Sequence, residues 1–507
     1  TWAITAQKSR VPMEVCETLQ LDDLVLCGEG RLSNHDEIRS SLGLPRDASV
    51  LRTVAASFRA WGEGFAARLR GSFALGLWQP ESQTLRLYRD HFGTIPLYFW
   101  STDDSVCFSS ALPPLVRRRA NRAVDTVHAT SFLAGTHQPG STFYQEIRRV
   151  PAATYLSSRG GVLTTRRYWL PCGQRERYQG DYGAVLEAAF EQSIARCLQQ
   201  PGRAALMLSG GLDSSAILAC APPGTLRPYT IGFPPEEGCD EGSYVAETLK
   251  RLGVLGQRVE SASWAPWEGQ SALEEQTGEP VCRANLHFRW NLYPRLAEDG
   301  IEVLLDGHDG DTVLSHGYER LPSLLLRGAL WSLLRESRTQ AAQRRVPLLR
   351  YLRGVATGLL VPQNVRRAQR RTRTNLASAY LRVPPPETLT RAHTTSHLTN
   401  ITHPFQELSL ERLHCIGRHH EIAARHPFFD VDLVECALRA PVDLKLHHGH
   451  NRFALRSFSA RRLPRCVAWR RDKTVFSQQA RTRLHQRHRE RIVEMFNHPP
   501  TMLEDLV

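Results

Sequence analysis

The stretch "ALMLSGGLDSSAI", residues 205–217, decides the fold of the second half of this chain. An apolar run ends at a serine and two glycines, and an aspartate and two serines precede another apolar run. Glycines let backbone N–H groups approach phosphate oxygens, and the N-terminus of a helix favours an anion. The stretch therefore predicts a strand, a phosphate-binding loop and a helix. A plain strand–turn–helix connection with capping Ser and Asp is the alternative.

Each polar position of this loop suggests a role. Ser209 and Ser214 offer hydroxyl donors, and Gly210 and Gly211 provide the permissive backbone. Asp213 suits a phosphate site only if a cation lies between the two anions, so we expect it to bind Mg²⁺. No GKS or GKT follows, which excludes a Walker-type P-loop.

Strand and helix patterns alternate on both sides of the loop. Apolar runs predict strands at 203–209, 227–233 and 301–307. Helical patterns lie at 182–200, 214–221 and 244–253. Such alternation is typical of a doubly wound parallel sheet, which binds ligands beyond the carboxyl ends of its strands.

The first part of the chain has a different pattern. Short alternating segments such as "LRLYRDHF" (85–92) and "SVCFSSA" (105–111) predict strands, and "VLRTVAASFRAWG" (50–62) predicts a helix closed by Gly62. We expect an α+β domain over 1–170 and an α/β domain over 182–507, joined by the polar segment 171–181.

The composition of the chain indicates the cellular compartment in which we expect the protein. The chain has 507 residues, and its eleven cysteines are scattered without a CxxC pair, as in a protein with reduced thiols. No window of eighteen apolar residues predicts a membrane span, and the first residues lack the apolar core of a signal peptide. We therefore expect a cytoplasmic protein.

Positive charge is concentrated in one region. The net charge is +13, and thirteen arginines against one acid, Glu336, lie between Leu321 and Arg382. These arginines either form a solvated helical face or attract an anionic partner. No nucleic-acid-binding motif accompanies them and aromatic residues are sparse, so we do not expect a nucleic-acid partner.

Further segments of the chain, together with the loop, indicate a family resemblance. SGGLDS after an apolar strand resembles the pyrophosphate loop of the ATP pyrophosphatases, and nearly all of 182–480 resembles the asparagine synthetase family. The resemblance is carried, in the family's order, by "RPYTIGF" (227–233), "CDEGSYVAETLKRLG" (239–253), "LLDGHDGDTVLSHGY" (304–318), "RHPFFDVDLVECALRAPVDLK" (425–445) and "LPRCVAWRRDKTVF" (463–476).

This resemblance implies a site for ATP and Mg²⁺. Asp213 and Asp311 would hold Mg²⁺ on the triphosphate. Lys473 would neutralise charge on the α-phosphate and the departing pyrophosphate. Backbone and apolar contacts to adenine would come from Leu208, Ile231 and Gly307.

Histidines offer further candidates. His308 stands where the family has a glutamate or, in its β-lactam-forming members, a catalytic tyrosine. It is either a general base for an incoming amine or a structural residue. The group His414, His419, His420 and His426 has dissimilar sequence contexts, and we do not expect it to bind zinc.

The first part resembles the glutamine amidotransferase domain of the same family, which has an Ntn-type αββα fold. The segments "GEGRLSNHDEIRSSLGL" (28–44), "AWGEGFAARLRGSFALGLW" (60–78) and "YRDHFGTIPLYF" (88–99) carry the likeness. Thr1 replaces the nucleophilic cysteine, and the Asn-Gly-Glu glutamine clamp aligns with Glu29, Gly30 and Arg31. The substrate-binding aspartate falls near Val50. We expect a retained scaffold without glutaminase activity.

A synthetase without ammonia delivery needs an amine from its substrate. Two branches of the family work in this way, the β-lactam synthetases and the lasso peptide cyclases, and "DGHDGDTVLSHG" and "WRRDKTVF" are more similar to the cyclases. We predict a lasso peptide macrolactam synthetase that adenylates an Asp or Glu side chain of a precursor core peptide and joins it to the N-terminal amine. The resemblance implies a leader-binding protein and a leader peptidase as partners. Another amide-forming enzyme acting on a small molecule and a regulatory nucleotide-binding protein are the alternatives.

Overall fold

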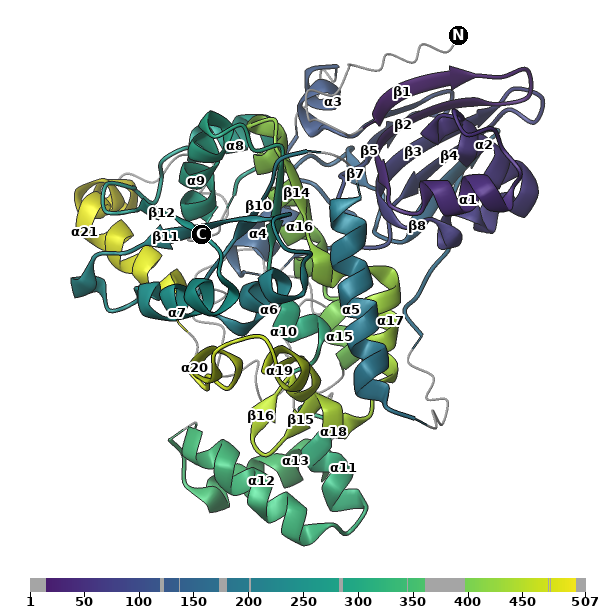
Figure 1. The fold of residues 1–507 in the computed structure, drawn as a ribbon. Helices are drawn as coiled ribbons and strands as arrows, with labels where there is room; N and C mark the ends of the chain where they lie inside the picture. Colours follow the sequence, from purple (N-terminus) through teal and green to yellow (C-terminus); the bar gives the residue numbers. More distant parts are fainter. Residues whose placement is uncertain are drawn as a thin grey trace.

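A computed structural model describes most of the chain, and Figure 1 shows a β-rich N-terminal part beside a larger α/β part. The described residues are 15–118, 123–135, 137–172, 180–199, 202–281, 286–343, 345–360, 397–472, 474 and 476–497. Most of the predicted linker, 171–181, lies outside them. No described helix has the length and apolar character needed to cross a membrane.

A six-stranded antiparallel sheet forms the centre of the N-terminal part. Its order is β1-β2-β3-β4-β8-β9. The strands are β1 (Val15–Gln20), β2 (Val25–Leu32), β3 (Gly71–Gln79), β4 (Thr84–Arg89), β8 (Thr154–Arg159) and β9 (Val162–Arg167). One face packs against α2 (Val50–Trp61), which begins after the capping residue Ser49 and ends at Gly62, as predicted. Helix α1 (His35–Ser41) packs beside α2. A 3₁₀ helix, η1 (Gly62–Arg68), follows α2 in the chain.

A smaller sheet covers the other face. It has the order β6-β5-β7, with β5 at Tyr98–Ser101, β6 at Val106–Ser109 and β7 at Arg148–Arg149. Along β5, Phe99 packs toward the large sheet, whereas Tyr98 and Trp100 pack with helix α3 (Leu112–Arg118). The layers are therefore helix, sheet, sheet, helix, the order that the sequence predicts. Helix α4 (Thr126–Leu133) follows α3.

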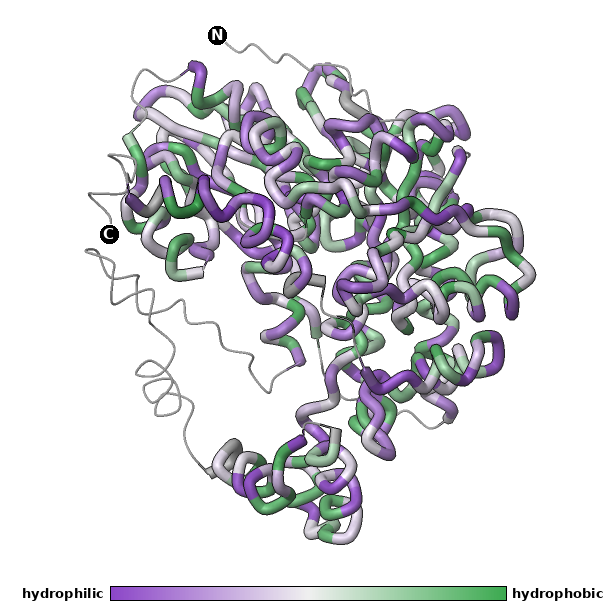
Figure 2. The backbone as a smooth tube through the Cα atoms, turned by 90° about the vertical axis from the view of Figure 1, so that its left-hand side faces the viewer, coloured by the Kyte–Doolittle hydropathy of each residue, from purple (hydrophilic) through white to green (hydrophobic). Residues whose placement is uncertain are grey.

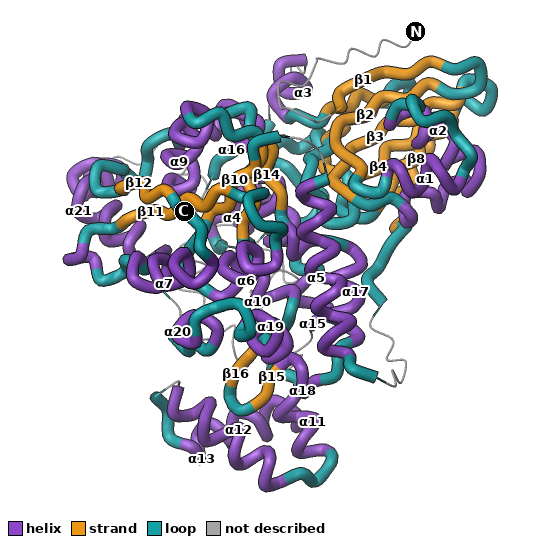
Figure 3. The backbone as a smooth tube through the Cα atoms, in the orientation of Figure 1, coloured by secondary structure: helices purple, strands orange, loops and turns teal. Residues whose placement is uncertain are grey.

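The second part is built on a five-stranded parallel sheet with the order β12-β11-β10-β13-β14 (Figure 3). Its strands are β10 (Ala204–Met207), β11 (Arg227–Gly232), β12 (Gln257–Glu260), β13 (Val303–Asp306) and β14 (Ala423–Arg425). The predicted parallel sheet is confirmed. The strand order reverses at β10, so the crevice between the carboxyl ends of β10 and β13 is the expected ligand position.

Helices cover both faces of this sheet. Along β10, Leu206 faces one apolar core and Ala205 faces the other, as expected for a strand buried on both sides. The helical elements of this part, apart from those that project from it, are α5 (Tyr182–Leu198), α6 (Leu212–Cys220), η2 (Pro235–Glu237), α7 (Gly242–Leu252), α8 (Gln270–Thr277), α9 (Leu286–Glu298), α10 (Gly310–Val313), α15 (His397–Ile401), α16 (Pro404–His419), η4 (Pro427–Phe429), α17 (Val431–Arg439), α18 (Val442–Lys445), α19 (Phe453–Ser459), α20 (Arg465–Ala468) and α21 (Phe476–Asn497).

Three helices project from this body and are called the three-helix module below: α11 (Arg320–Leu326), α12 (Leu330–Gln343) and α13 (Leu348–Leu360). Figures 1 and 2 show the module at the lower end of the molecule, beneath a short hairpin of β15 (Leu446–His447) and β16 (His450–Asn451). Its apolar core includes Leu321 and Leu333, and it packs on Leu446 of the hairpin. The remainder of the predicted helical region, 361–396, lies outside the described residues.

Buried charges join the two parts. This interface charge cluster consists of Arg89 and Arg149 from the first part and Glu279, Glu407, Glu411 and Arg412 from the second. The fully buried Arg89 donates to Glu407 at 2.6 Å and to Glu411 at 2.9 Å. The Tyr98 hydroxyl donates to Glu411 at 2.6 Å. Each buried charge therefore faces an opposite charge, which buried ions require.

Candidate functional site

The loop after β10 is closed by its own serines. The Ser209 N–H donates to the Ser214 hydroxyl at 3.0 Å, and the two hydroxyl oxygens are 3.0 Å apart. The Gly211 N–H donates to the Ser209 hydroxyl at 3.2 Å, and α6 begins at the next residue. The serines that we predicted as phosphate donors thus also fix the loop at the positive end of a helix.

Glu241 and Arg470 support this loop from outside, and neither was predicted as a site residue from the sequence. The Gly210 N–H donates to Glu241 Oε2 at 2.9 Å. Arg470 donates to the Gly210 carbonyl at 3.0 Å and to Glu241 Oε1 at 2.6 Å, and it lies 4.0 Å from the centre of the Tyr244 ring. Glu241 and Tyr244 belong to the quoted segment 239–253, so their family likeness was the available signal.

The loop after β13 lies directly against the loop after β10. A Cβ on Gly307 would lie 2.8 Å from the Ser214 nitrogen, and one on Gly310 would lie 2.8 Å from Asp213 Cγ. A larger residue at either position would force the loops apart. The close approach therefore requires glycine at both positions, and it brings Asp213 and the helix bearing Asp311 to one edge of the sheet.

Arg452 pairs with the first of these aspartates and was missed in the sequence. Its Nη1 donates to both Asp213 carboxylate oxygens at 2.6 Å, and the residue is 8% exposed. Burial lowers the pKa of Arg452, but Asp213 and then Asp311 outweigh this effect and raise it. A guanidinium thus neutralises the carboxylate that we predicted to bind a cation.

Asp306, the last residue of β13, is the buried anchor of the second loop. It pairs with Arg289 at 2.5 Å and with His426 Nδ1 at 2.9 Å, and it accepts the His308 N–H at 3.0 Å. Burial disfavours its charge, but Arg289 and His426 hold the pKa of the carboxyl well below its usual value. Asp306 therefore carries a negative charge that fixes the backbone before His308.

The His308 ring has a defined position beside α16. Its Nε2 lies 3.0 Å from the Ser409 hydroxyl and 3.5 Å from Asp309 Oδ2, and the ring stacks on Phe429 with centroids 6.0 Å apart. Burial lowers the pKa of His308 to about 4, despite the opposing effect of Asp309. The imidazole is consequently neutral near pH 7 and able to accept a proton.

The remaining residues predicted to contact ATP differ in what the structure shows of them. Leu208 is buried; its N–H bonds the Tyr229 carbonyl at 2.8 Å and its carbonyl accepts the Thr230 hydroxyl at 2.8 Å. Ile231 is half-buried near the carboxyl end of β11. Lys473 lies outside the described residues.

Asp213 and Asp311 are the two carboxylates at this edge that we predicted to bind magnesium. Mg²⁺ usually takes one or two protein carboxylates together with substrate phosphates and water, so Asp213 and Asp311 would suffice. No group of three or more His, Cys, Asp or Glu in the described part of the chain is arranged to hold a metal. Among the four clustered histidines, His426 contacts Asp306 and His419 contacts Gln276, so their side chains serve different neighbours.

The positions aligned with the glutamine clamp now make domain contacts. Glu29 is buried and accepts from Arg418 of α16 at 2.9 Å, and Arg31 donates to the Arg196 carbonyl. The cavity beside Glu29, Arg31 and Val50 measures about 10 Å³, which is room for no more than about one water molecule. Among the described residues, this cavity at the aligned positions is therefore too small for glutamine.

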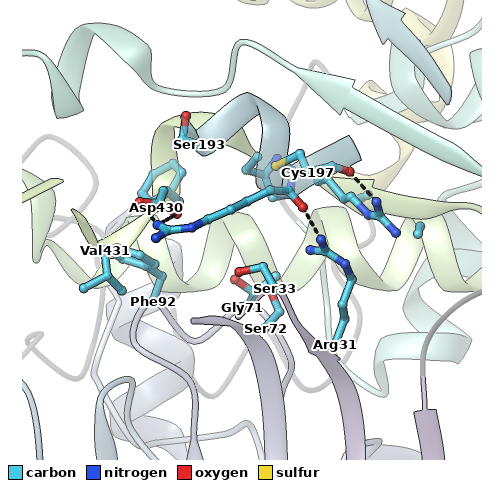
Figure 4. Close-up of a pocket in the computed structure, with 16 residues that line it drawn as sticks. Arg31, Ser33, Gly71, Ser72, Phe92, Ser193, Cys197, Asp430 and Val431 are labelled. Carbon is cyan, nitrogen blue, oxygen red and sulfur yellow. Dashed lines mark hydrogen bonds and ion pairs between the residues drawn. The ribbon is translucent and has the colours of Figure 1, made fainter. Parts of the chain in front are cut away.

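A second cavity lies between the two parts and measures about 70 Å³ (Figure 4). Arg31 reaches into its wall from β2, and Asp430 lies on the opposite side with Val431 and Phe92. Asp430 pairs with Arg196 at 2.9 Å. Residue 31 has thus become part of the contact between the two parts of the chain.

Comparison with known proteins agrees with these two parts. The family "Asparagine synthase" matches residues 185–507, and the family "Glutamine amidotransferase domain" matches residues 5–169. Glutamine phosphoribosylpyrophosphate amidotransferase from B. subtilis, complexed with ADP and GMP, aligns over 58% of this chain and 64% of that chain at 11% identity. The TM-score of that alignment is 0.22, too low to indicate a shared overall fold.

Curated relatives share limited identity with the chain. It is 23% identical over 314 residues to asparagine synthetase [glutamine-hydrolyzing] 1 of Bacillus subtilis (strain 168), covering 58% of this chain and 49% of that protein. It is 24% identical over 340 residues to amidase chyE of Penicillium rubens, covering 59% and 48%. The chain thus spans about half the length of these relatives. Because the asparagine synthase match covers more than half of its residues, the chain belongs to the asparagine synthase family.

Proposed function

We propose that this protein is an ATP-dependent ligase that activates a carboxylate as an acyl-adenylate and joins it to an amine supplied by the substrate. One observation carries the proposal. The chain has a glycine-rich loop with Asp213 at the reversal point of its parallel sheet, while Glu29 and Arg31, at the positions of the family's glutamine clamp, bind Arg418 and the Arg196 carbonyl instead. Activation by ATP is thus favoured without delivery of ammonia.

The nucleotide would bind across the carboxyl ends of β10 and β13. The N–H groups at the start of α6 favour an anion there, and Arg452 and Arg470 add positive charge beside the loop. Asp213 and Asp311 would hold Mg²⁺, which would offset the charge of the triphosphate. Lys473, if it reaches the site as the family resemblance implies, would stabilise the departing pyrophosphate.

His308 is suited to the second half-reaction. A neutral imidazole accepts the proton that the attacking amine loses as the amide bond forms and AMP departs. Ser409 and Asp309 fix the ring, and Asp306 fixes the backbone that carries it. The pKa of about 4 keeps the His308 ring unprotonated over the whole neutral range, and it also makes the ring a weak base until the substrate binds.

Within this class, we propose a lasso peptide macrolactam synthetase. It would join an Asp or Glu side chain of a precursor core peptide to the peptide's N-terminal amine. Closure within one bound molecule is worth about 7–11 kcal/mol relative to a bimolecular step. A leader-binding protein and a leader peptidase would supply the free core peptide. The arginine-rich three-helix module favours a long acidic substrate over the small molecule of a β-lactam-type reaction.

Exchange of labelled pyrophosphate into ATP tests the first half-reaction. The purified protein with Mg²⁺ and a candidate core peptide should catalyse exchange, and the peptide product should be lighter by one water. Peptides with the acceptor carboxylate amidated serve as controls. Absence of exchange with every peptide and small carboxylate tested would refute the ligase. Exchange with small amino-acid derivatives alone would indicate a small-molecule substrate, as in a β-lactam-type reaction.

A further inference from the structure

We propose that the three-helix module is a docking surface for an acidic polypeptide segment that also carries apolar side chains. This inference rests on the proposed function only in taking the bound chain to be the peptide substrate. Four features of the module support it: exposed apolar residues, unbalanced positive charge, the arrangement of both on the helices, and the connection to the nucleotide site.

Large apolar side chains are exposed where α11 passes into α12. Leu326 is 78% exposed, Leu330 is 62% exposed and Trp331 is 86% exposed, all within six consecutive residues. The module's core uses other residues, such as Leu321 and Leu333. A tryptophan beside two leucines in water is unfavourable unless a partner covers them, and aromatic anchors are typical of binding surfaces.

The positive charge of the module indicates that its partner is negatively charged. Its exposed arginines are Arg327, Arg335, Arg338, Arg345, Arg350 and Arg353. None of these six arginines pairs with an acid among the described residues. The acid Glu336 is fully buried and accepts backbone N–H groups of the hairpin instead. The surface therefore presents uncompensated positive charge and favours an acidic chain.

Apolar and basic residues share single helix faces. On α12, Trp331, Arg335 and Arg338 lie at i, i+4 and i+7, and on α13 the exposed Leu349 and Arg353 lie at i and i+4. A polypeptide segment that carries both acidic and apolar side chains would complement these two helix faces. Nucleic acid would use the arginines but would leave most of the apolar surface uncovered.

The chain's own neighbouring segment is a poor occupant. Residues 361–396, which follow α13, carry seven arginines and one acid, Glu387. Like charge opposes their binding to a basic surface. The C-terminal residues 498–507 contain Glu504 and Asp505 among apolar residues, so the test below includes their removal.

The module is tied to the nucleotide site through the hairpin β15–β16. Glu336 accepts the N–H groups of His448 and Gly449 at 2.7 and 2.6 Å, and Gln340 donates to the Gly449 carbonyl at 3.0 Å. Arg452, which pairs with Asp213, follows the hairpin directly. A polypeptide bound to the module is therefore held on the element that leads into the proposed nucleotide site.

Fluorescence anisotropy tests the docking surface without ATP. The probe is a labelled synthetic peptide of alternating Glu and Leu, compared with a Lys–Leu peptide of equal length. The wild-type protein should bind the Glu–Leu peptide more tightly, and less tightly as salt is raised. Trp331→Ala and the pair Arg335→Glu/Arg338→Glu should each weaken binding by about tenfold or more. These positions are exposed, so the variants should keep the wild-type melting temperature.

Matched controls carry the same changes elsewhere. Leu255→Ala removes a leucine that is 93% exposed, and Arg46→Glu/Arg52→Glu reverses two exposed charges in the first part. Both should bind like the wild type, as should a chain ending at Asn497. The proposal is overturned if the module variants bind like the wild type, if both peptides bind equally, or if loss of the tail strengthens binding strongly. Tighter binding of an RNA duplex or of anionic vesicles through the same residues would also overturn it.

The pyrophosphate exchange assay separates the two proposals. Module variants should still catalyse exchange with a saturating short carboxylate substrate, because none of these residues lies in the nucleotide site. Normal peptide binding with no exchange by any variant would refute the ligase and leave the docking surface standing.

Discussion

Arg452 donates from a single Nη1 atom to both carboxylate oxygens of Asp213, each at 2.6 Å. This pair links the start of α19 to the start of α6, two elements far apart in the sequence. It keeps Asp213 neutralised without nucleotide. A bound polyphosphate and its cation would have to share or replace this contact. We therefore expect the Arg452–Asp213 ion pair to change when a charged ligand binds.

Loss of either aspartate should abolish adenylation. Asp213→Ala and Asp311→Ala remove the two carboxylates predicted to hold Mg²⁺, and chelation with EDTA should produce the same loss of pyrophosphate exchange. The exposed Asp36→Ala serves as a matched control and should be fully active. Circular dichroism must show a folded variant, because Asp213→Ala leaves Arg452 buried without its partner. Turnover like the wild type in either variant would exclude the assigned role.

His308→Ala should spare adenylation and slow amide formation by about 10²–10⁴-fold, the usual contribution of a general base. Because its pKa is about 4, the wild-type rate should not depend on His308 ionisation from pH 6 to 8 and should fall as pH approaches 4. Single-turnover measurement of the two half-reactions separates the effects. An equal loss in both would assign His308 to binding or structure.

Glutamine should not serve as a nitrogen donor. The Glu29–Arg418 and Arg31–Arg196 contacts fill the positions of the clamp, and the cavity beside them holds about one water at most. Incubation with glutamine, with and without ATP, should release no glutamate above a blank. Release of glutamate in step with product would show that the first part is an active amidotransferase.

The interface charge cluster should dominate the stability of the domain contact. Arg89→Ala leaves Glu411 fully buried without one of its cations and should cost about 3–5 kcal/mol. Arg59→Ala breaks the exposed pair with Asp23 and should cost about 0–1 kcal/mol. Urea denaturation followed by tryptophan fluorescence compares the two. Equal midpoints would show that the cluster contributes little.

Acid should destabilise the fold through buried histidines. Burial lowers the pKa of His91 from 6.5 to about 3, so the unfolded chain binds a proton that the folded chain excludes between these values. The free energy of unfolding should therefore fall as pH is lowered from about 6.5 toward 3. His91→Phe, which suits the surrounding rings of Phe73, Tyr168 and Trp169, should make this fall less steep. The same change at the exposed His485 should have no such effect.

Local sequence patterns predicted much of this architecture. The glycine-rich loop, the helix ended by Gly62 and the parallel strands depend on neighbours within a few residues, and the structure confirms them. Strand β12 and strand β14 were missed because they span only Gln257–Glu260 and Ala423–Arg425. Such short segments show too little periodicity to be distinguished from loops.

The polar network of the site was harder to predict. Arg452 contacts Asp213 across 239 positions, and His426 contacts Asp306 across 120. Nothing in a local pattern distinguishes such residues from exposed charges, because their partners are fixed only by the folded sheet. Family likeness indicated the two aspartates but gave no reason to select Arg452.

The Arg89–Glu411 contact also bears on how genes of this kind can change. Two substitutions, at positions 29 and 31, replace the Asn and Glu of the glutamine clamp with which they align. Deleting the region that contains Arg89 and Arg149 would expose to water the face of the second part that carries Glu279, Glu407 and Glu411, with only Arg412 left beside them. A lineage that stops using glutamine can therefore lose the chemistry residue by residue, while the reading frame that encodes the domain is kept by selection for folding.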